Sequence, residues 1–361
     1  MTFATQELQA SAYAVGRKGR CFIQPTRLHA THVATARYLY SASGHARESI
    51  APPNVLKRWK RFLSCLRHID TFSGWLGNPA ESALRQALAH RPSIVSCVSR
   101  PYLHRGWPAC RKLAVIRDHY RLVGDRYAFL GFEPSGSIRL AGLDEALTCA
   151  VADAPPIDAL QLRLDKPGWF EHEGELTLSL LAGAERLYSL VFTLGFVEAE
   201  SVAWIGALQG QGTAEALDVY RRLTHRLHGL RPRDLVVTAF RQLCRSLNVE
   251  RILAVSDETR VSSDPYFDSR AAVFASYDTV WLENGGTPPA AAVAGARPEA
   301  GLFELSVVPA RRADAEIPSR KRAQYRRRYA MLDELATQID AAIRDEQVRG
   351  DHVDARAQGL I

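Results

Sequence analysis

Long apolar segments are missing from this chain. No stretch approaches the roughly 18 to 20 uninterrupted apolar residues that a membrane-spanning helix requires. The first 24 residues also lack the order of a secretory signal, because Glu7 comes early and the cationic residues come late. We therefore expect no transmembrane segment and a cytoplasmic protein.

Closely spaced metal ligands are missing too. The six cysteines are dispersed, with no CxxC pair, whereas a disulfide framework or a zinc knuckle needs tighter spacing. We expect reduced and mostly buried thiols, with Cys244 on the inward face of a helix. His225 and His228 stand three residues apart, but no third ligand is near them in the sequence, so we predict no metal site.

Three common catalytic signatures are also missing. The chain contains no GxSxG, no GxGxxG and no GxxxxGK[ST]. A nucleophile-elbow hydrolase, a dinucleotide enzyme and a P-loop nucleotidase are therefore disfavoured.

What the chain does have is globular composition and an uneven positive charge. Its 361 residues are 47% hydrophobic and 24% charged, which is enough for a sizeable core in one large domain or two ordinary ones. Eight of the residues from 311 to 328 are Lys or Arg, against two acids. Such a cluster attracts polyanions, namely RNA, an acidic carrier protein or an anionic membrane surface, unless it is only a solvated helix face. The candidate polyanion-binding residues are Arg320, Lys321, Arg322, Arg326 and Arg327. Tyr325 and Tyr329 among them either stack on bases or pack inward.

The order of the hydrophobic patterns predicts an α+β fold. Residues 1–124 have mainly helical spacing, as in 55–69, and form a helical N-terminal subdomain or lid. Strand signals follow at 127–134, 158–165, 174–183, 186–195 and 201–210, then helices at 214–228 and 233–248 and strands at 251–257, 278–286 and 301–309. A closing helix covers 319–349. We predict a mixed, mostly antiparallel sheet with a parallel βαβ crossover in a domain spanning 125–349, and a frayed tail at 350–361.

Four sequence blocks carry a resemblance to a known family. They are "WIGALQG" (204–210), "RRLTHRLHGLRPRDLVVTAFRQL" (221–243), "ILAVSD" (252–257) and "SRKRAQYRRRYAMLDEL" (319–335). Together they resemble the VirK/YbjX family of bacterial proteins, over roughly residues 37–345. The resemblance implies a link to virulence and envelope stress, but no settled activity.

The order of elements is also similar, more loosely, to the N-acetyltransferase-like (GNAT) superfold. That likeness implies that the turn before helix 233–248 holds the pyrophosphate of an acyl donor. A helix N-terminus suits this task, because it has free amides and a partial positive charge. The chain departs from the superfold in its turn, Arg231-Pro232-Arg233-Asp234, which is not glycine-rich, and in the extra helix 214–228. Donors carried by tRNA or by an acyl-carrier protein are therefore as compatible as acyl-CoA.

The predicted donor site combines this turn with the crevice of the crossover. Arg231 and Arg233 form an anion clamp, unless they are exposed or Arg233 pairs with an acid such as Asp234. Trp204 and Gly206 are expected to flank a crevice at the ends of the parallel strands.

Four further side chains are candidates for catalysis: His228, Ser256, Asp257 and Glu283. His228 is a general base or substrate ligand, or else a histidine that interacts with a helix C-terminus. Asp257 either orients an amine and takes its proton, or caps a turn. Glu283 is followed two residues later by two glycines, which would admit a ligand.

These observations favour two functions. The first is an acyl- or aminoacyl-transferase that moves an acyl group from a phosphate-bearing donor to an amine or hydroxyl, with polarised strand amides stabilising the oxyanion. The second is a non-enzymatic adaptor that binds an acidic partner, RNA or anionic lipid through 311–328.

Overall fold

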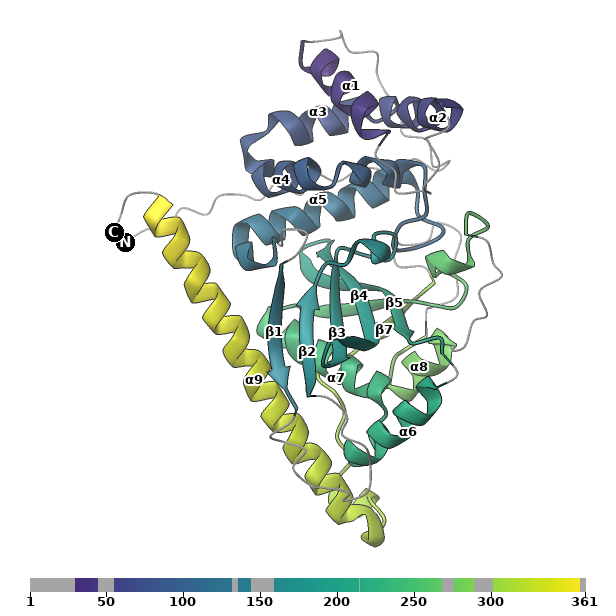
Figure 1. The fold of residues 1–361 in the computed structure, drawn as a ribbon, viewed down its shortest axis with the longest axis vertical. Coiled ribbons are helices and arrows are strands. Elements are labelled where there is room, and N and C mark those ends of the chain that lie inside the picture. The colour runs from purple at the N-terminus through teal and green to yellow at the C-terminus, as the bar shows by residue number, and fades with distance from the viewer. Residues whose placement is uncertain are drawn as a thin grey trace.

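A seven-stranded mixed sheet forms the middle layer of the computed structural model, which describes residues 30–44, 55–131, 136–143, 159–213, 215–267, 276–288 and 301–357 (Figure 1). The strands lie side by side in chain order. They are β1 (Ser137–Gly142), β2 (Leu160–Asp165), β3 (Leu176–Ala182), β4 (Glu185–Val197), β5 (Glu200–Gly210), β6 (Arg251–Val255) and β7 (Leu302–Leu305). Each neighbouring pair is antiparallel except β5 and β6, which are parallel. The predicted α+β class, with its parallel βαβ crossover, is confirmed.

Helices cover both faces of this sheet. On β4, Phe192 packs edge-on against Phe240 of α7 (Pro232–Ser246), with the ring centroids 4.8 Å apart. The next residue, Thr193, lies 3.2 Å from the hydroxyl of Tyr102, on the side of α5 (Ala109–Arg126). Successive strand residues point to opposite faces, so α5 and α7 lie on opposite sides of the sheet. This double cover explains why every residue of β3 is buried.

The N-terminal part of the described chain is helical, as predicted. It contains α1 (Ala30–Ala42), α2 (Val55–Leu66), α3 (Ile69–Gly77), α4 (Ser82–His90) and the 3-10 helices η1 (Pro79–Glu81) and η2 (Pro92–Val98). Figure 1 shows α1 to α4 stacked beyond α5, away from the sheet. One continuous buried cluster nevertheless joins Leu39 of α1, Leu113 of α5 and Leu178 of β3. The division at residue 124 stays a prediction.

The crossover between β5 and β6 contains two helices, as predicted. They are α6 (Ala216–Arg226) and α7, and α9 (Ser319–Ala357) then packs on α7 and along β1. The backbone of α9 remains helical beyond residue 349, where a frayed tail was predicted, and residues 358–361 lie outside the described chain. No helix of the described residues is both long enough and apolar enough to cross a membrane.

Two predicted strands are wrong. Within 127–134, residues Ala128–Leu130 form a 3-10 turn, while 132–135 lie outside the described residues, and the first strand is β1 instead. The stretch 278–286 is mostly the helix α8 (Tyr277–Glu283), which is capped by the Ser276 hydroxyl and stopped at Gly285 with φ +73°. Tyr277, Val280 and Trp281 are its buried residues, at spacings i, i+3 and i+4 that fit a helix.

Four cysteines lie in the described chain, and they agree with the predicted reduced state. Cys65, Cys97 and Cys244 are free and buried, and Cys110 is half-buried. Cys21 and Cys149 lie outside the described residues.

Candidate functional site

The structure brings the predicted cationic turn together with one of the predicted acids. Arg231 is the N-cap residue of α7, and its Nη1 lies 2.7 Å from Oε2 of Glu283 at the end of α8. Arg233 pairs with the same carboxylate oxygen and lies 3.4 Å from Asp234. Glu283 therefore sits where an anionic donor would bind, and a phosphate would have to displace it. The anion clamp stays a prediction.

His228 has a structural position that the sequence did not reveal. It follows α6 with φ +53°, and Gly229 after it also has positive φ. The Gly229 amide donates to the Thr224 carbonyl at 2.7 Å and the His228 amide to the His225 carbonyl, which is the Schellman arrangement. Its own carbonyl accepts two hydrogen bonds from Arg328 of α9, at 2.8 and 3.1 Å. Partial burial and the charges of Arg327 and Arg328 lower the pKa of the His228 imidazole.

The place predicted for the crevice is where β5 and β6 separate, and side chains of α8 pack there. The two strands pair in parallel only as far as Ile205 and Ala254. Beyond them, the Leu208 amide donates to the Tyr277 hydroxyl at 3.0 Å, and the Trp281 indole donates to the Val255 carbonyl at 2.8 Å. The strand amide that was predicted to face an oxyanion therefore has a side-chain partner at Leu208.

A buried acid that the sequence reasoning missed lies directly on this crevice. A Cβ atom at Gly206 would stand only 1.9 Å from the carbonyl oxygen of Glu173, so glycine is required for this close approach. The Glu173 Oε2 oxygen is buried, with no hydrogen-bond partner among the described residues. Burial raises the pKa of the Glu173 carboxyl to about 7, and the charge of Glu171 adds to the effect. Trp204, two residues before Gly206, is fully buried. Its ring packs edge-on against that of Trp107, with the centroids 5.2 Å apart.

Ser256 and Asp257 shape the turn after β6. The Ser256 amide and hydroxyl are both bonded to the Thr259 hydroxyl. Asp257 accepts from the Ser276 hydroxyl at 2.5 Å and from the Tyr277 amide at 2.9 Å, which ties the turn to the start of α8. Although burial opposes it, these hydrogen bonds and the charge of Arg260 lower the pKa of Asp257. These contacts are those expected of an aspartate that caps a turn, and they position Tyr277.

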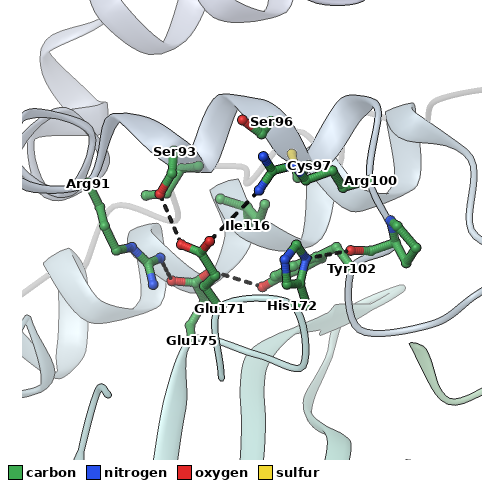
Figure 2. A pocket seen from close by; sticks show the side chains of 12 residues that line it. Arg91, Ser93, Ser96, Cys97, Arg100, Tyr102, Ile116, Glu171, His172 and Glu175 are labelled. Atoms are coloured by element: carbon green, nitrogen blue, oxygen red, sulfur yellow. Dashed lines mark hydrogen bonds and ion pairs between the residues drawn. The ribbon is translucent and has the colours of Figure 1, made fainter. Parts of the chain in front are cut away.

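A second cluster of buried charges surrounds Glu175, just before β3 (Figure 2). The Glu175 side chain is 2% exposed, and Oε2 accepts from Arg91, from the Tyr120 hydroxyl at 2.6 Å and from Lys166 Nζ at 2.9 Å. The Tyr102 hydroxyl donates to Oε1 at 3.1 Å. Burial alone would raise the pKa of Glu175, but the cations of Arg91 and Lys166 hold it well below its usual range. Burial and the Arg91 charge lower the pKa of Lys166 to about 8.

Cavities lie against this cluster. A narrow pocket of about 20 Å³ is bordered by Glu175, Tyr102 and His172, which Figure 2 shows facing one another. A larger cavity of about 650 Å³ opens between α4, α5 and the residues after β2. Glu171 borders both spaces and accepts from the Ser93 hydroxyl at 3.0 Å. Residues 171–175, "EHEGE", thus place acids at alternate positions, next to Gly206 and next to the Glu175 cluster. This alternation of acids is the sequence pattern that could have pointed to the two sites.

The predicted polyanion-binding residues lie at the start of α9. Arg320, Lys321, Arg326 and Arg327 are exposed, whereas Arg322 donates to the Ile317 carbonyl at 3.1 Å. Arg326 lies 3.8 Å from the exposed Asp314.

The two tyrosines of this region stack under arginines of their own chain. Arg328 lies 4.3 Å from the Tyr325 ring centroid, and Arg311 lies 5.1 Å from that of Tyr329. Within the described residues, no three His, Cys, Asp or Glu side chains are grouped so that they could hold a metal ion.

Comparison with known proteins identifies relatives. The family model described as "Protein of unknown function (DUF535)" matches residues 53–341. An Escherichia coli K12 protein described as "Uncharacterized protein YbjX" is 30% identical over 264 residues, which cover 72% of this chain and 75% of the relative. Two Haemophilus influenzae proteins are 30% and 28% identical over 42% and 43% of the chain and 47% and 48% of their own lengths. No solved structure matches significantly. The VirK/YbjX resemblance is confirmed.

Proposed function

The chain belongs to the DUF535 family, whose description assigns no activity, and we propose that it is an acyl- or aminoacyl-transferase with its chemistry between β5 and β6. One observation carries the proposal. The backbone carbonyl of Glu173 lies against Gly206, where β5 parts from β6, and the largely buried carboxyl of the same residue has an oxygen with no hydrogen-bond partner among the described residues. A carboxyl whose pKa is about 7 is suited to act as a general base at neutral pH.

The neighbouring tyrosine supplies the complementary acid. Burial raises the pKa of Tyr277 to about 12, so its hydroxyl keeps its proton. That hydroxyl accepts the Leu208 amide and can still donate to a leaving atom. Two groups whose environments push their pKa values apart are typical of acid–base pairs in active sites.

The transfer step follows from these roles. The acceptor nitrogen or oxygen gives its proton to Glu173 and forms a bond to the acyl carbon. The bond from that carbon to the donor's sulfur or oxygen breaks, and the leaving atom takes the proton of Tyr277. Arg231 and Arg233 would hold the donor's phosphate in place of Glu283, and Trp204 would form the crevice wall. His228, Ser256, Asp257 and Glu283 remain proposed members of the site. The donor remains a carrier-bound acyl group, acyl-CoA or aminoacyl-tRNA.

Acyl transfer can be measured with the full-length chain. An acyl-CoA, an acylated carrier protein and an aminoacyl-tRNA would each be offered with a mixture of amines and alcohols, and products identified by mass spectrometry. We expect Glu173→Gln to lower kcat/KM by roughly 10² to 10⁴, the usual contribution of a general base. The matched change Glu200→Gln, at an exposed acid of β5, should leave the rate unchanged. Transfer with no donor class, or full activity of Glu173→Gln, would disprove the proposal.

The exposed cations of α9 favour a second candidate function. Arg320, Lys321, Arg326 and Arg327 project from the start of the helix. Such a surface suits an adaptor that binds an acidic carrier protein, RNA or an anionic membrane, in the virulence or envelope-stress role that the VirK/YbjX resemblance implies.

A further inference from the structure

The 650 Å³ cavity between α4 and α5 is separate from the crevice and has no part in the proposed transfer. Its volume falls within the range of roughly 300 to 1,000 Å³ that is typical of small-molecule sites. It is bordered by the end of α4, the middle of α5 and Lys166 to Glu171, the connection that follows β2. What the cavity binds follows from the groups that face it.

The charged groups are distributed unequally around this space. Arg91, Lys166 and the Tyr120 hydroxyl all border the large cavity, whereas their shared partner Glu175 borders only the narrow pocket behind them. Glu171 is the acid on the cavity wall, and it accepts from Ser93 and lies 3.9 Å from Arg100. Two cations and one acid thus line the cavity itself, and the charge of Glu175 behind them offsets part of the positive charge. An anion is therefore the ligand that this charge attracts.

Donor groups remain available at the positive end. The Arg91 Nε atom is buried with no hydrogen-bond partner among the described residues, although Nη2 donates to Tyr120 and Glu175. The Lys166 ammonium has three protons, and two partners are present, Glu175 and the Tyr120 hydroxyl. A carboxylate or phosphate oxygen in the cavity would therefore accept the third proton of Lys166, while Arg91, whose Nε atom is buried, contributes its charge.

The rest of the wall combines small apolar residues with the polar side chains of Ser82, Gln86, His90 and Ser93. Ala83 and Ala87 come from α4, Val123 from α5 and Ala128 from the turn after it. These short side chains leave room beyond the cations. The ligand therefore has an apolar part in addition to its anionic head.

From these features we propose that the cavity binds a small amphipathic anion, a carboxylic acid or phosphate monoester with an apolar group. Arg91 and Lys166 bind the head, and the small apolar residues Ala83, Ala87, Val123 and Ala128 contact the apolar part. No pattern in the sequence indicates this site, because its groups come from three separated segments.

Calorimetric titration of the full-length protein tests the site with defined probes. Octanoate and octyl phosphate carry the two anionic heads, octylammonium carries the opposite charge on the same chain, and inorganic phosphate lacks the apolar part. We expect 1:1 binding of octanoate, octyl phosphate or both, at least tenfold tighter than octylammonium or inorganic phosphate, because charged hydrogen bonds and apolar contact both contribute. Whichever head binds more tightly identifies the natural group.

Two variants examine the head and the wall independently. Lys166→Gln removes one cation but leaves Arg91 on Glu175, and we expect it to weaken anion binding about tenfold or more. Ala87→Phe fills the space without touching a charge and should abolish binding. Their matched controls are Lys60→Gln and Ala330→Phe at exposed positions, which should bind as the unchanged protein does. Thermal unfolding of each variant confirms that it is folded.

The results separate this site from the transfer site. Glu173→Gln should bind octanoate and octyl phosphate normally even if acyl transfer is lost, and binding is expected whether or not any transfer is found. The proposal is wrong if octylammonium binds as tightly as the anions, if both cavity variants bind like the unchanged protein, or if Glu173→Gln abolishes binding.

Discussion

At the scale of single residues, burial decides which groups have unusual chemistry. Glu173 and Glu175 are two residues apart, yet burial dominates at one and neighbouring cations at the other. Their pKa values therefore shift in opposite directions. Such environments depend on which distant segments cover a side chain, and Arg91 lies 84 positions from Glu175. The sequence could place Trp204 and Gly206 on a strand, because that strand is strongly apolar, but it could not identify Glu173 or Lys166.

His119 gives the first residue-scale prediction, because it is wholly buried beside this cluster. Its Nδ1 accepts the Leu194 amide at 3.3 Å. Burial, aided by the charges of Lys166 and Arg91 and opposed by Glu175, lowers the pKa of His119 to about 3. Below about pH 6.5 the unfolded chain therefore binds a proton at this histidine, whereas the folded chain keeps it neutral. Stability is complete above about pH 6.5 and falls progressively between pH 6.5 and 3.

Urea unfolding at pH 7, 6 and 5 measures this effect. We expect His119 to account for a loss of about 2 kcal/mol between pH 6.5 and 5, at 1.36 kcal/mol per pKa unit. That part of the loss should be absent in His119→Gln and retained in His90→Gln, which changes an exposed histidine. Glu173 has the opposite sign, because its raised pKa makes stability fall as the pH rises from about 4.5 to 7. The comparison must therefore be made between variants. If stability changed with pH equally in His119→Gln and in the unchanged protein, the prediction for His119 would be wrong.

At the scale of elements, apolar periodicity predicted most of the structure. The helices 214–228 and 233–248 and the strands 174–183 to 201–210 were located to within a few residues, because their patterns repeat over several turns or alternations. The two wrong strands are short. In 278–286 the apolar Val280, Trp281 and Leu282 are consecutive, and a run of that length fits either state. The helix is favoured by the Ser276 cap and by the packing of Tyr277 against β5, where its hydroxyl accepts the Leu208 amide.

The end of α6 gives an element-scale prediction. His228 occupies a left-handed position at which most residues cost about 1 kcal/mol relative to glycine, while its bonds to Arg328 use only its carbonyl oxygen. We expect His228→Gly to raise the free energy of unfolding by roughly 0.5 to 1 kcal/mol, measured by urea denaturation. Asn248→Gly, at the equivalent position after α7 with φ +50°, should give a smaller gain, because asparagine tolerates this conformation better.

The same variant examines the predicted catalytic role of His228. A stabilised protein with unchanged acyl transfer would mean that the side chain takes no part in the reaction. A destabilised His228→Gly protein would show instead that the imidazole makes contacts more important than the backbone strain.

At the scale of the whole molecule, the candidate sites lie on different layers. The crevice and the anion cavity share the connection 166–175, which covers the sheet on the side of α5. The basic start of α9 lies at the far end of that helix from α5 (Figure 1). A polyanion bound there would not block the cavity between α4 and α5. Binding to α9 and binding in the cavity can therefore be measured separately.

The adaptor candidate makes a whole-molecule prediction about salt. Arg320, Lys321, Arg326 and Arg327 are exposed, so each can neutralise one phosphate and release a counterion. Replacing all four with Gln should reduce the slope of log K against log salt concentration by about 3 for single-stranded RNA. Fluorescence anisotropy with a labelled RNA oligonucleotide measures this slope, and flotation with phosphatidylglycerol vesicles measures the membrane alternative.

A matched variant decides whether position or total charge matters. Four other exposed cations lie away from α9, and replacing them with Gln removes the same charge: Lys57, Lys60, Arg67 and Arg222. If the α9 surface is an interaction site, this second variant keeps most of its affinity, because the remaining cations are still clustered where a chain of phosphates can contact them together. Equal losses in the two variants would mean that only net charge attracts the polyanion, and α9 would then be a solvated helix face. Unchanged RNA and vesicle binding in the α9 variant would exclude this helix as the surface that binds them.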